Sequence, residues 1–510
     1  LPGGKEGNYE ALDLWLRFLF PVLGGLLIGL IFKYYSKGLY VLGVARVMER
    51  MSYHQGYLTI RGFFLQFIGA AIAIISGHSV GREGPHVYLG AAASSLFGQF
   101  LKLPNNSIRI MVGCGTAAGI AASFNTPLAG VIFALEVVMM EYTIASFIPV
   151  IIAAFSATSI SNLVLGNDPA FIVAEVHMGS LGEIFLVLLL GFIAGTVSAV
   201  FIHLMHRVAV SSKAIPFWWR TTLAGVIIGI IALFVPEIMG IGYDTARQAL
   251  AGELGIQLLM ILVIFKLLAT VASVGLGIPG GMIGPALFIG VCLGGFFGGV
   301  LKFIFPELSI DIGFYALLGM GAMMGASLQA PLAALTAMME LTYSPQIIMP
   351  GMLAIVVANL TASELFRKES LFITMLKASD LDYDANPVTQ TLRRIGAASL
   401  MCKQFVQLQQ YVTFENIDKV LKENPQWLLI ETESGENVLM PAVDLVRYLG
   451  HDEFTKEQEG QVNTDSLVDL LQIPAERLQA HSIHIQATLE EALEVLDNSP
   501  AEALYVERSI

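Results

Sequence analysis

An arginine and a glutamate interrupt an otherwise apolar stretch in the first third of the chain. The stretch covers residues 70–96, and the interruption is the run Gly81–Pro85, which contains Arg82 and Glu83. Ionisable groups are rare where hydrocarbon is the natural solvent, and there they usually mark functional sites. The run is therefore predicted to form a buried anion site that has its own titratable carboxylate.

The residues around this pair predict a broken helix. Two glycines and a proline make residues 81–85 a poor helix interior, so a new helix is expected to begin near Glu83. A helix N-terminus offers unpaired N–H groups to an anion. An ionised Glu83 would occupy that place, and protonation would remove its charge. The alternative is an ion pair between Glu83 and Arg82, but adjacent side chains on a helix do not face each other.

The composition is that of a polytopic membrane protein. The chain of 510 residues is 55% hydrophobic and 14% charged, which is too apolar for an ordinary soluble globule. Almost the whole net charge of −13 lies in residues 366–510, so this tail is expected to be soluble and not to bind nucleic acid. The sequence shows no catalytic nucleophile with a matching general base, and the chain is not expected to be an enzyme. Cysteines 114, 292 and 402 lack disulfide or zinc-site spacing.

Many of the apolar segments are short. Several contain fewer than the roughly 20 residues that a bilayer-spanning helix needs. Short segments that end in glycine and proline are typical of discontinuous helices. Helices are predicted at about 12–33, 59–77, 86–101, 107–122, 127–163, 181–210, 219–239, 256–275, 285–304, 312–328, 331–342 and 347–366.

A motif from the first half of the apolar region recurs in the second half. Pro127-Leu128-Ala129 with Glu136 returns as Pro331-Leu332-Ala333 with Glu340. The break that ends at Pro85 is matched upstream of the second copy by residues 277–285. Two halves of this kind commonly enclose a site near the membrane midplane. Generic packing of small residues between membrane helices is the alternative, and the matching order of the features argues against it.

The tail contains a second repeat. Residues 412–425 resemble residues 487–500, and each copy predicts a capping threonine, an amphipathic helix, a turn and a strand. The predicted strands are 427–431 and 503–507. The second copy stops at residue 510, short of its last strand and helix, and is expected to be truncated.

Together these motifs resemble the CLC family of chloride channels and proton-coupled chloride exchangers. The resemblance rests on residues 81–85, the loop Gly280-Gly281-Met282-Ile283-Gly284-Pro285 and the paired Pro-Leu-Ala helices, and the tail resembles a CBS-domain pair. It implies an all-α polytopic membrane protein with an inverted-repeat CLC-like fold and broken helices, plus a small α/β CBS-pair-like cytosolic domain. The expected domains are a transmembrane anion-transport domain at 1–366, a linker at 367–384 and the tail at 385–510.

The resemblance also assigns roles to residues. Glu83 stands at the position of the family's external gate, and the N–H groups of Met282 and Ile283 are expected to hold the anion. Arg82 is expected either to raise the potential at the external mouth or to donate to nearby carbonyls. The full predicted anion-binding set is Leu42, Gly43, Arg82, Gly84, Met282, Ile283 and Phe372.

Two members of this set depart from the family pattern. Leu42 stands where the family has a serine, and Phe372 stands where it has a tyrosine, so two hydroxyl donors are missing. Such a site must rely on backbone N–H groups, on water or on an anion that brings its own donors. The expected substrate is chloride, with bicarbonate or nitrate as alternatives.

The predicted proton route consists of Glu83, Glu136 and Val137. Val137 stands where exchangers of the family usually carry a second glutamate and where channel members often carry valine. This substitution favours anion transport that is uncoupled from protons. Proton-coupled exchange stays open, because Glu136 could itself carry protons. The alternative for Glu136 and Glu340 is a structural role at the helix ends.

The remaining expectations concern partners and location. The resemblance implies a homodimer in a lipid bilayer, in the plasma (inner) membrane, with a cytoplasmic tail. The competing hypothesis is a non-conducting membrane scaffold whose tail senses a ligand. An adenine nucleotide is the candidate ligand, and the candidate contacts are Asp418 and Asp444, which are also ordinary helix-surface acids.

Overall fold

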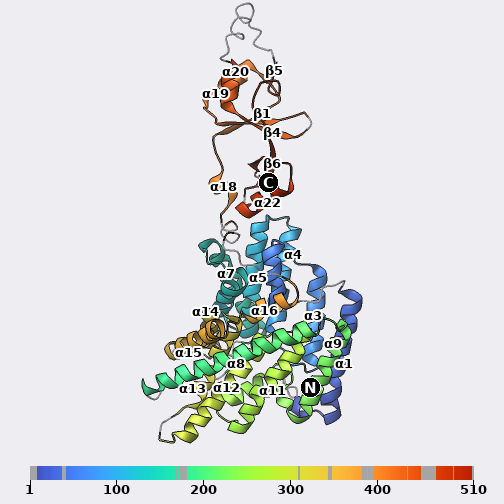
Figure 1. Cartoon of the computed structure of the whole chain (residues 1–510), viewed down its shortest axis with the longest axis vertical. Helices are drawn as coiled ribbons and strands as arrows, with labels where there is room; N and C mark the ends of the chain where they lie inside the picture. The colour runs from blue at the N-terminus through green and yellow to red at the C-terminus, as the bar shows by residue number, and fades with distance from the viewer. Residues whose placement is uncertain are drawn as a thin grey trace, which may run out of the picture. The chain divides into compact units, whose positions relative to one another are not determined.

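Two compact units make up the chain. The transmembrane unit is Leu1–Leu103 with Ser107–Tyr383, and the tail unit is Pro104–Asn106 with Asp384–Ile510. Figure 1 shows that the first is almost entirely helical and that the second contains the strands. The computed structural model describes residues 9–36, 42–166, 171, 181–307, 310–342, 347–381, 388, 392, 395–433, 435–449, 467–485 and 487–507.

Helices of very different length form the transmembrane unit. Among its described residues, eight helices are long and apolar enough to cross a membrane. Figure 1 shows helices from distant parts of the sequence side by side, and α1 packs along α9. The helices are α1 (Leu14–Tyr35), α2 (Val44–Tyr53), α3 (Ile60–Ile75), α4 (Glu83–Phe100), α5 (Asn105–Phe124), α6 (Pro127–Phe133) with the π-helical η2 (Ala134–Met139), α7 (Ile144–Leu165), α8 (Ile184–Ser211), α9 (Phe217–Phe234), α10 (Tyr243–Leu250), α11 (Ile256–Gly275), α12 (Ile283–Ile304), α13 (Ile312–Leu328), α14 (Pro331–Thr342), α15 (Ile348–Leu360) with η6 (Thr361–Leu365), and α16 (Leu371–Ala378).

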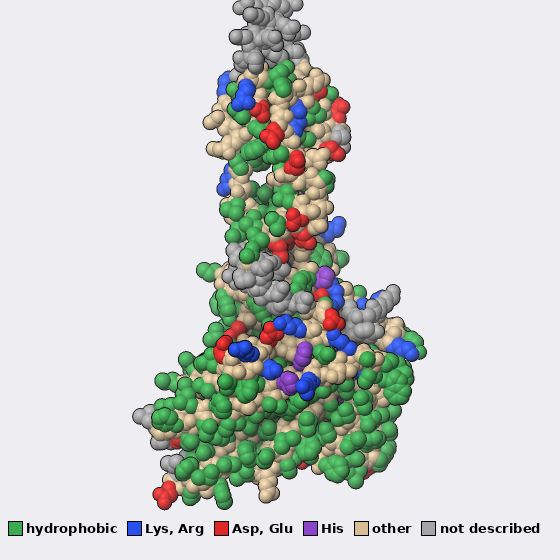
Figure 2. Space-filling view, in the orientation of Figure 1, with side chains coloured by type: hydrophobic (Ala, Val, Ile, Leu, Met, Phe, Trp, Pro, Cys, Tyr) green, Lys and Arg blue, Asp and Glu red, His purple; other side chains and the backbone are tan. Residues whose placement is uncertain are grey.

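The surface of this unit is predominantly apolar. Figure 2 shows hydrophobic side chains over most of its visible face. Phe155, Leu163 and Phe234 are among the large apolar side chains that are mostly exposed. Apolar exposure on this scale is unfavourable in water and is expected against lipid. The chain is therefore an integral membrane protein, as its composition predicts.

The two predicted breaks meet each other. Helix α4 begins at Glu83 and α12 begins at Ile283, each directly after its glycine-rich segment. The segments form an antiparallel bridge in which Gly81 N–H donates to the Gly281 carbonyl at 2.8 Å and Gly281 N–H donates back at 2.7 Å. A β-carbon on Gly84 would lie 2.9 Å from the Gly281 Cα, so the approach needs glycine.

The Pro-Leu-Ala helices of the two repeats cap one another. The carboxylate of Glu340 accepts from the backbone N–H groups of Leu128 and Ala129 at 3.0 and 2.7 Å. Its counterpart Glu136 accepts from the equivalent pair at the start of α14, Leu332 and Ala333, at 3.2 and 2.7 Å. A carboxylate at a helix N-terminus satisfies unpaired donors and interacts favourably with the helix dipole. Each half of the sequence repeat thus supplies the glutamate that caps a helix of the other half.

The remaining differences from the predicted helices have local causes. The predicted helix 127–163 is interrupted, because Met140 adopts a left-handed conformation and Thr143 starts a new helix by accepting from Ser146 N–H. Helices α2 and α10 were not predicted, since both are short and strongly amphipathic. Helix α16 lies inside the predicted linker 367–384 and packs against α8 and α2.

A mixed sheet organises the tail unit. Its order is β1-β3-β4-β6-β7, with β1 parallel to β3 and β6 parallel to β7. Strands β4 and β6 form the antiparallel join at the centre, and β2 pairs separately with β5. The strands are β1 (Phe405–Gln409), β2 (Tyr411–Thr413), β3 (Trp427–Glu431), β4 (Asn437–Pro441), β5 (Leu467–Asp469), β6 (Leu478–His484) and β7 (Ala503–Glu507).

Both copies of the tail repeat form a strand, helix, strand unit. Helix α19 (Phe414–Lys422) lies between β1 and β3 in sequence, and α22 (Leu489–Asn498) lies between β6 and β7. Strands β3 and β7 have the predicted bounds 427–431 and 503–507. Thr488 forms a capping box with Glu491, whereas Thr413 makes no side-chain cap bond. The other described helices of the tail are α18 (Ala397–Leu400) and α20 (Ala442–Leu449).

The reciprocal caps predict matched losses of stability. Glu136→Ala and Glu340→Ala each leave two helix N–H groups without their acceptor and should each lower the free energy of unfolding by about 1 kcal/mol. Thermal unfolding in detergent measures both, with the exposed Glu307→Ala as the control. A loss for one variant but not for the other would contradict the reciprocal arrangement.

Candidate functional site

The carboxylate of Glu83 is the centre of the site. Its side chain is completely buried, at the first residue of α4. The Tyr243 hydroxyl donates to Oε1 at 2.7 Å, and the Gly284 backbone N–H donates to Oε2 at 3.2 Å. Tyr243 is the first residue of α10, and Gly284 lies in the first turn of α12. The carboxylate thus occupies a helix N-terminus, where backbone N–H groups and the dipole favour an anion.

Glycines allow this close approach. A β-carbon on Gly81 would lie 1.9 Å from Glu83 Oε2, and one on Gly284 would lie 2.7 Å from Oε1. Sequence reasoning assigned the donors of this segment to Met282 and Ile283. The donor that reaches the carboxylate is the next residue, Gly284, because only glycine leaves room for Glu83 at that turn.

Lys266 fixes the turn that carries Tyr243. This lysine of α11 is completely buried, and its Nζ donates to the carbonyls of Ile238 and Gly240 at 3.0 and 2.9 Å. The ammonium also lies 4.7 Å from the centre of the Phe288 ring, a cation–π contact. Lys266 additionally interacts electrostatically with Glu83. The buried lysine therefore holds the turn before α10 by donating to its carbonyls.

Gly242 completes this turn. Its φ is +83°, and an added β-carbon would lie 2.8 Å from the Phe288 ring. Sequence reasoning missed both Tyr243 and Lys266. A signal for Lys266 was present, since it is an ionisable residue inside the predicted apolar helix 256–275.

Arg82 lies over the ring of Tyr243. Its guanidinium carbon lies 5.3 Å from the centre of the tyrosine ring. Its Nη2 donates to the Ser123 carbonyl at 2.9 Å, and the Ser123 hydroxyl in turn contacts Nδ1 of His86. Of the two roles expected for Arg82, donation to a carbonyl is the one whose contact is present.

A cavity of about 380 Å³ adjoins the broken segments. Its walls carry three cations, Arg46, Lys213 and Arg220. Asp380 at the wall pairs with Lys213 at 2.6 Å. The charged groups of the wall are thus three cations and one carboxylate, and a net positive concave site attracts anions. Six of the seven predicted anion-binding residues line it together: Leu42, Gly43, Gly84, Met282, Ile283 and Phe372.

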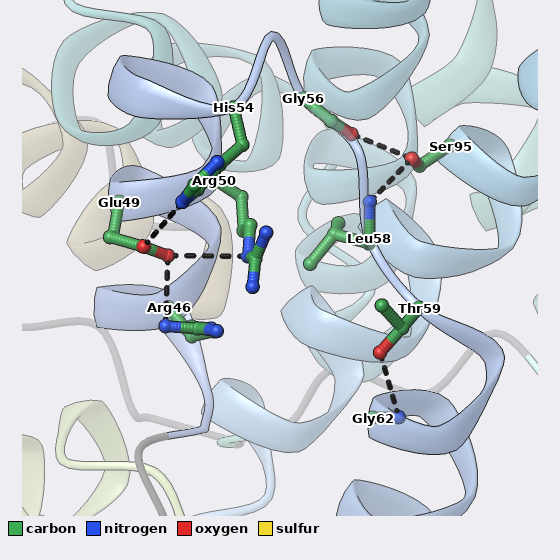
Figure 3. Close-up of polar contacts among 9 residues, drawn as sticks. All are labelled: Arg46, Glu49, Arg50, His54, Gly56, Leu58, Thr59, Gly62 and Ser95. Atoms are coloured by element: carbon green, nitrogen blue, oxygen red, sulfur yellow. Dashed lines mark hydrogen bonds and ion pairs between the residues drawn. The ribbon is translucent and has the colours of Figure 1, made fainter. Parts of the chain in front are cut away.

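Glu49 holds Arg46 beside this cavity. The Glu49 side chain is 5% exposed and contacts Arg46 at 3.1 Å, Arg50 at 3.4 Å and His54 at 3.2 Å (Figure 3). Figure 3 also shows Ser95 of α4. Its hydroxyl donates to the Gly56 carbonyl and accepts from the backbone N–H of Leu58. The Glu49 contacts hold α2 together, and the Ser95 contacts hold the segment after α2 against α4.

Leu42 and Phe372 bring no side-chain donor to the cavity wall. Leu42 is apolar, and Phe372 is buried with its ring edge-to-face against Phe133 at 6.2 Å. Gly43 lines the cavity, but its backbone N–H donates to Gln66 Oε1 at 2.8 Å. Gly43, a predicted anion-binding residue, thus lies at the cavity wall with its N–H bonded to a side-chain oxygen of the protein.

Two residues of the predicted proton route, Glu136 and Val137, lie in different environments. Both carboxylate oxygens of Glu136 accept backbone N–H groups of α14. Val137 is buried among apolar side chains. Glu136 and Glu340 therefore make the hydrogen bonds that a structural role at the helix ends requires.

Comparison with known proteins identifies the family. The family model described as voltage gated chloride channel matches residues 24–363. A putative chloride channel protein, ClcB-like, from Ralstonia nicotianae is 33% identical over 371 residues, which cover 71% of this chain and 86% of the relative. The chain belongs to the CLC family.

Solved CLC structures share the fold. A slow cyanobacterial Cl⁻/H⁺ antiporter matches with a TM-score of 0.66 and 22% identity, covering 72% of this chain and 88% of its own. A eukaryotic CLC transporter matches with a TM-score of 0.64 and 18% identity, covering 99% of this chain and 90% of its own. The helical membrane fold predicted from the broken segments and the repeat is confirmed.

The buried lysine gives a prediction about stability. Lys266→Met fills similar space but leaves two buried carbonyls without their donor, so the free energy of unfolding should fall by about 2 kcal/mol. Thermal unfolding in detergent measures the loss. Lys302→Met is the matched control, because Lys302 is exposed near the end of α12. Equal melting temperatures for the two variants would contradict the role of Lys266.

Proposed function

We propose that this CLC protein moves a small anion across the membrane and that Glu83 is the gate of the path. The observation that carries the proposal is the position of the Glu83 carboxylate. It is buried on the N-terminus of α12 and accepts from Gly284 N–H and the Tyr243 hydroxyl, which are groups that would equally bind an anion. The cavity beside this carboxylate, with its three cations, supports transport, and we propose no catalytic activity.

The path follows from the cavity. Gly84, Met282 and Ile283 lie in its wall and are sequence neighbours of Glu83 and Gly284. An anion attracted by Arg46, Lys213 and Arg220 reaches this wall and meets the ionised carboxylate. Passage requires Glu83 to leave its donors, and protonation favours this because it removes the charge that holds the side chain there.

The gate predicts a change in pH dependence. Glu83→Gln keeps the size of the side chain but removes the charge, so anion flux at pH 7.5 should rise by about tenfold and become nearly independent of pH. Chloride efflux from proteoliposomes at pH 7.5 and pH 5 measures this. Glu307→Gln, an exposed substitution, should keep the wild-type profile. A Glu83→Gln variant with the wild-type profile would remove Glu83 from the gate.

We propose further that the flux is not tightly coupled to protons. The support is Val137, which has no titratable group, and Glu136, whose two oxygens are engaged by α14. Proton-coupled exchange is the alternative, and the name of the cyanobacterial relative of the fold, a Cl⁻/H⁺ antiporter, is in its favour.

Coupling is measured directly in proteoliposomes with an outward chloride gradient. The uncoupled path predicts chloride efflux with no uphill movement of protons. Glu136→Gln should leave the chloride flux within about twofold of the wild type, since its hydrogen bonds are structural. Uphill proton uptake that disappears in Glu136→Gln would establish the exchanger and contradict the uncoupled path.

Chloride is the proposed substrate, and bicarbonate and nitrate are the alternatives. The apolar side chains of Leu42 and Phe372 support bicarbonate among the alternatives, because bicarbonate brings an O–H donor of its own. A flux panel of the three anions ranks them.

The proposed setting is a homodimer in the plasma (inner) membrane, with a CBS-pair-like cytoplasmic tail. Two parallel strand pairs, each with its own helix, support the CBS pair. Nucleotide sensing by the tail remains the competing function. Asp444 contacts Arg447 on its own helix at 3.4 Å, and the side chain of Asp418 lies outside the described residues. Titration of the whole protein with ATP tests this function.

A further inference from the structure

The hydroxyl of Tyr243 occupies a fixed position beside the gate. The side chain of Tyr243 lies among aromatic rings, with Phe171 edge-on at 5.5 Å and Phe124 at 6.3 Å between ring centres. The Arg82 guanidinium covers the ring at 5.3 Å. A ring enclosed by these groups has little freedom to turn its hydroxyl elsewhere.

The backbone beneath Tyr243 is equally constrained. The carbonyls of Ile238 and Gly240 accept from the buried Lys266, and Gly242 directly before Tyr243 has a positive φ. The hydroxyl is therefore held by the fold and does not depend on its bond to Glu83. When the carboxylate leaves, the hydroxyl and the Gly284 N–H remain in place without an acceptor, and a buried donor without an acceptor is unfavourable.

We propose that Tyr243 supplies a hydroxyl ligand of the anion path at the position that the gate itself occupies. It donates to Glu83 in the closed state and to the permeating anion in the open state. This inference rests on the proposed function. It also accounts for Leu42 and Phe372: the hydroxyl donors expected near the cavity are absent there, and a hydroxyl donor is present at the gate instead.

The anion and the Glu83 carboxylate compete for the same hydrogen-bond donors. The anion and the Glu83 carboxylate share two donors, the Tyr243 hydroxyl and the Gly284 N–H, so removing the hydroxyl weakens both ligands. The charged or titratable groups that face this position are Arg82, Lys266 and, through Ser123, His86. All of them are retained when Tyr243 becomes phenylalanine, so the variant tests the hydroxyl alone.

Anion binding tests the open-state contact. Isothermal titration of the purified protein with chloride compares Glu83→Ala, in which the site is vacant for the anion, with the double variant that adds Tyr243→Phe. The double variant should bind chloride about tenfold more weakly, the usual effect of losing a hydrogen bond to a charged partner. An unchanged dissociation constant would overturn the proposal.

The fully buried Tyr315 provides the control. The Tyr315 hydroxyl donates to Glu183 Oε2 at 3.0 Å, far from Glu83 in sequence and on other elements. Tyr315→Phe in the Glu83→Ala background removes a comparable hydrogen bond and should leave chloride affinity unchanged. Equal losses of affinity for the two tyrosine variants would assign the effect to general destabilisation and overturn the proposal.

Flux in proteoliposomes tests the closed-state contact and does not depend on a stable protein in detergent. With Glu83 intact, Tyr243→Phe should raise chloride flux at pH 7.5 several-fold, because the carboxylate loses a donor. In the Glu83→Ala background the same substitution should not raise flux. A rise in both backgrounds would contradict the shared donor.

Different results would contradict the proposed function and the role of Tyr243. If Glu83→Ala neither binds nor conducts chloride, bicarbonate or nitrate, the proposed function fails, and the role of Tyr243 fails with it. If Glu83→Ala binds chloride and Tyr243→Phe changes neither affinity nor flux, only the role of Tyr243 fails.

Discussion

The pairing of two helix N-termini through glycine backbones is the constraint on which the structure of the site depends. Gly81 and Gly281 exchange two hydrogen bonds, and this bridge brings the starts of α4 and α12 together. No larger residue could stand at these positions without displacing the Glu83 carboxylate or the opposite backbone. The bridge creates a small volume rich in N–H donors inside an apolar protein, and an acidic side chain occupies it.

The rest of the transmembrane unit holds this arrangement in place. Glu136 and Glu340 cap each other's repeat, so the two halves that carry the breaks are linked at a second level. Lys266 pins the turn before α10 and supplies a positive charge near the buried carboxylate. The energetics are those of a low-dielectric interior, where each buried charge must have donors, acceptors or a counter-charge.

The sequence predicts the parts of this site that depend on local chemistry. Glycine and proline mark the break before Glu83, and repeat spacing identifies the matching break before Ile283. Tail strands 427–431 and 503–507 follow from alternation and turn residues. Contacts between distant segments are different. Tyr243 lies 160 residues from Glu83, and nothing in its neighbours indicates that its hydroxyl reaches the Glu83 carboxylate. The occupied N–H of Gly43 is likewise a tertiary contact.

The most direct test of the account is the location of a bound anion when the Glu83 carboxylate, the proposed gate, is removed. A crystal of Glu83→Ala soaked in bromide reports this through anomalous scattering. The account predicts a bromide peak in place of the missing carboxylate, within hydrogen-bonding reach of both the Gly284 N–H and the Tyr243 hydroxyl. A bromide peak in the cation-lined cavity, with none at the N-terminus of α12, would contradict the claim that gate and anion share one site.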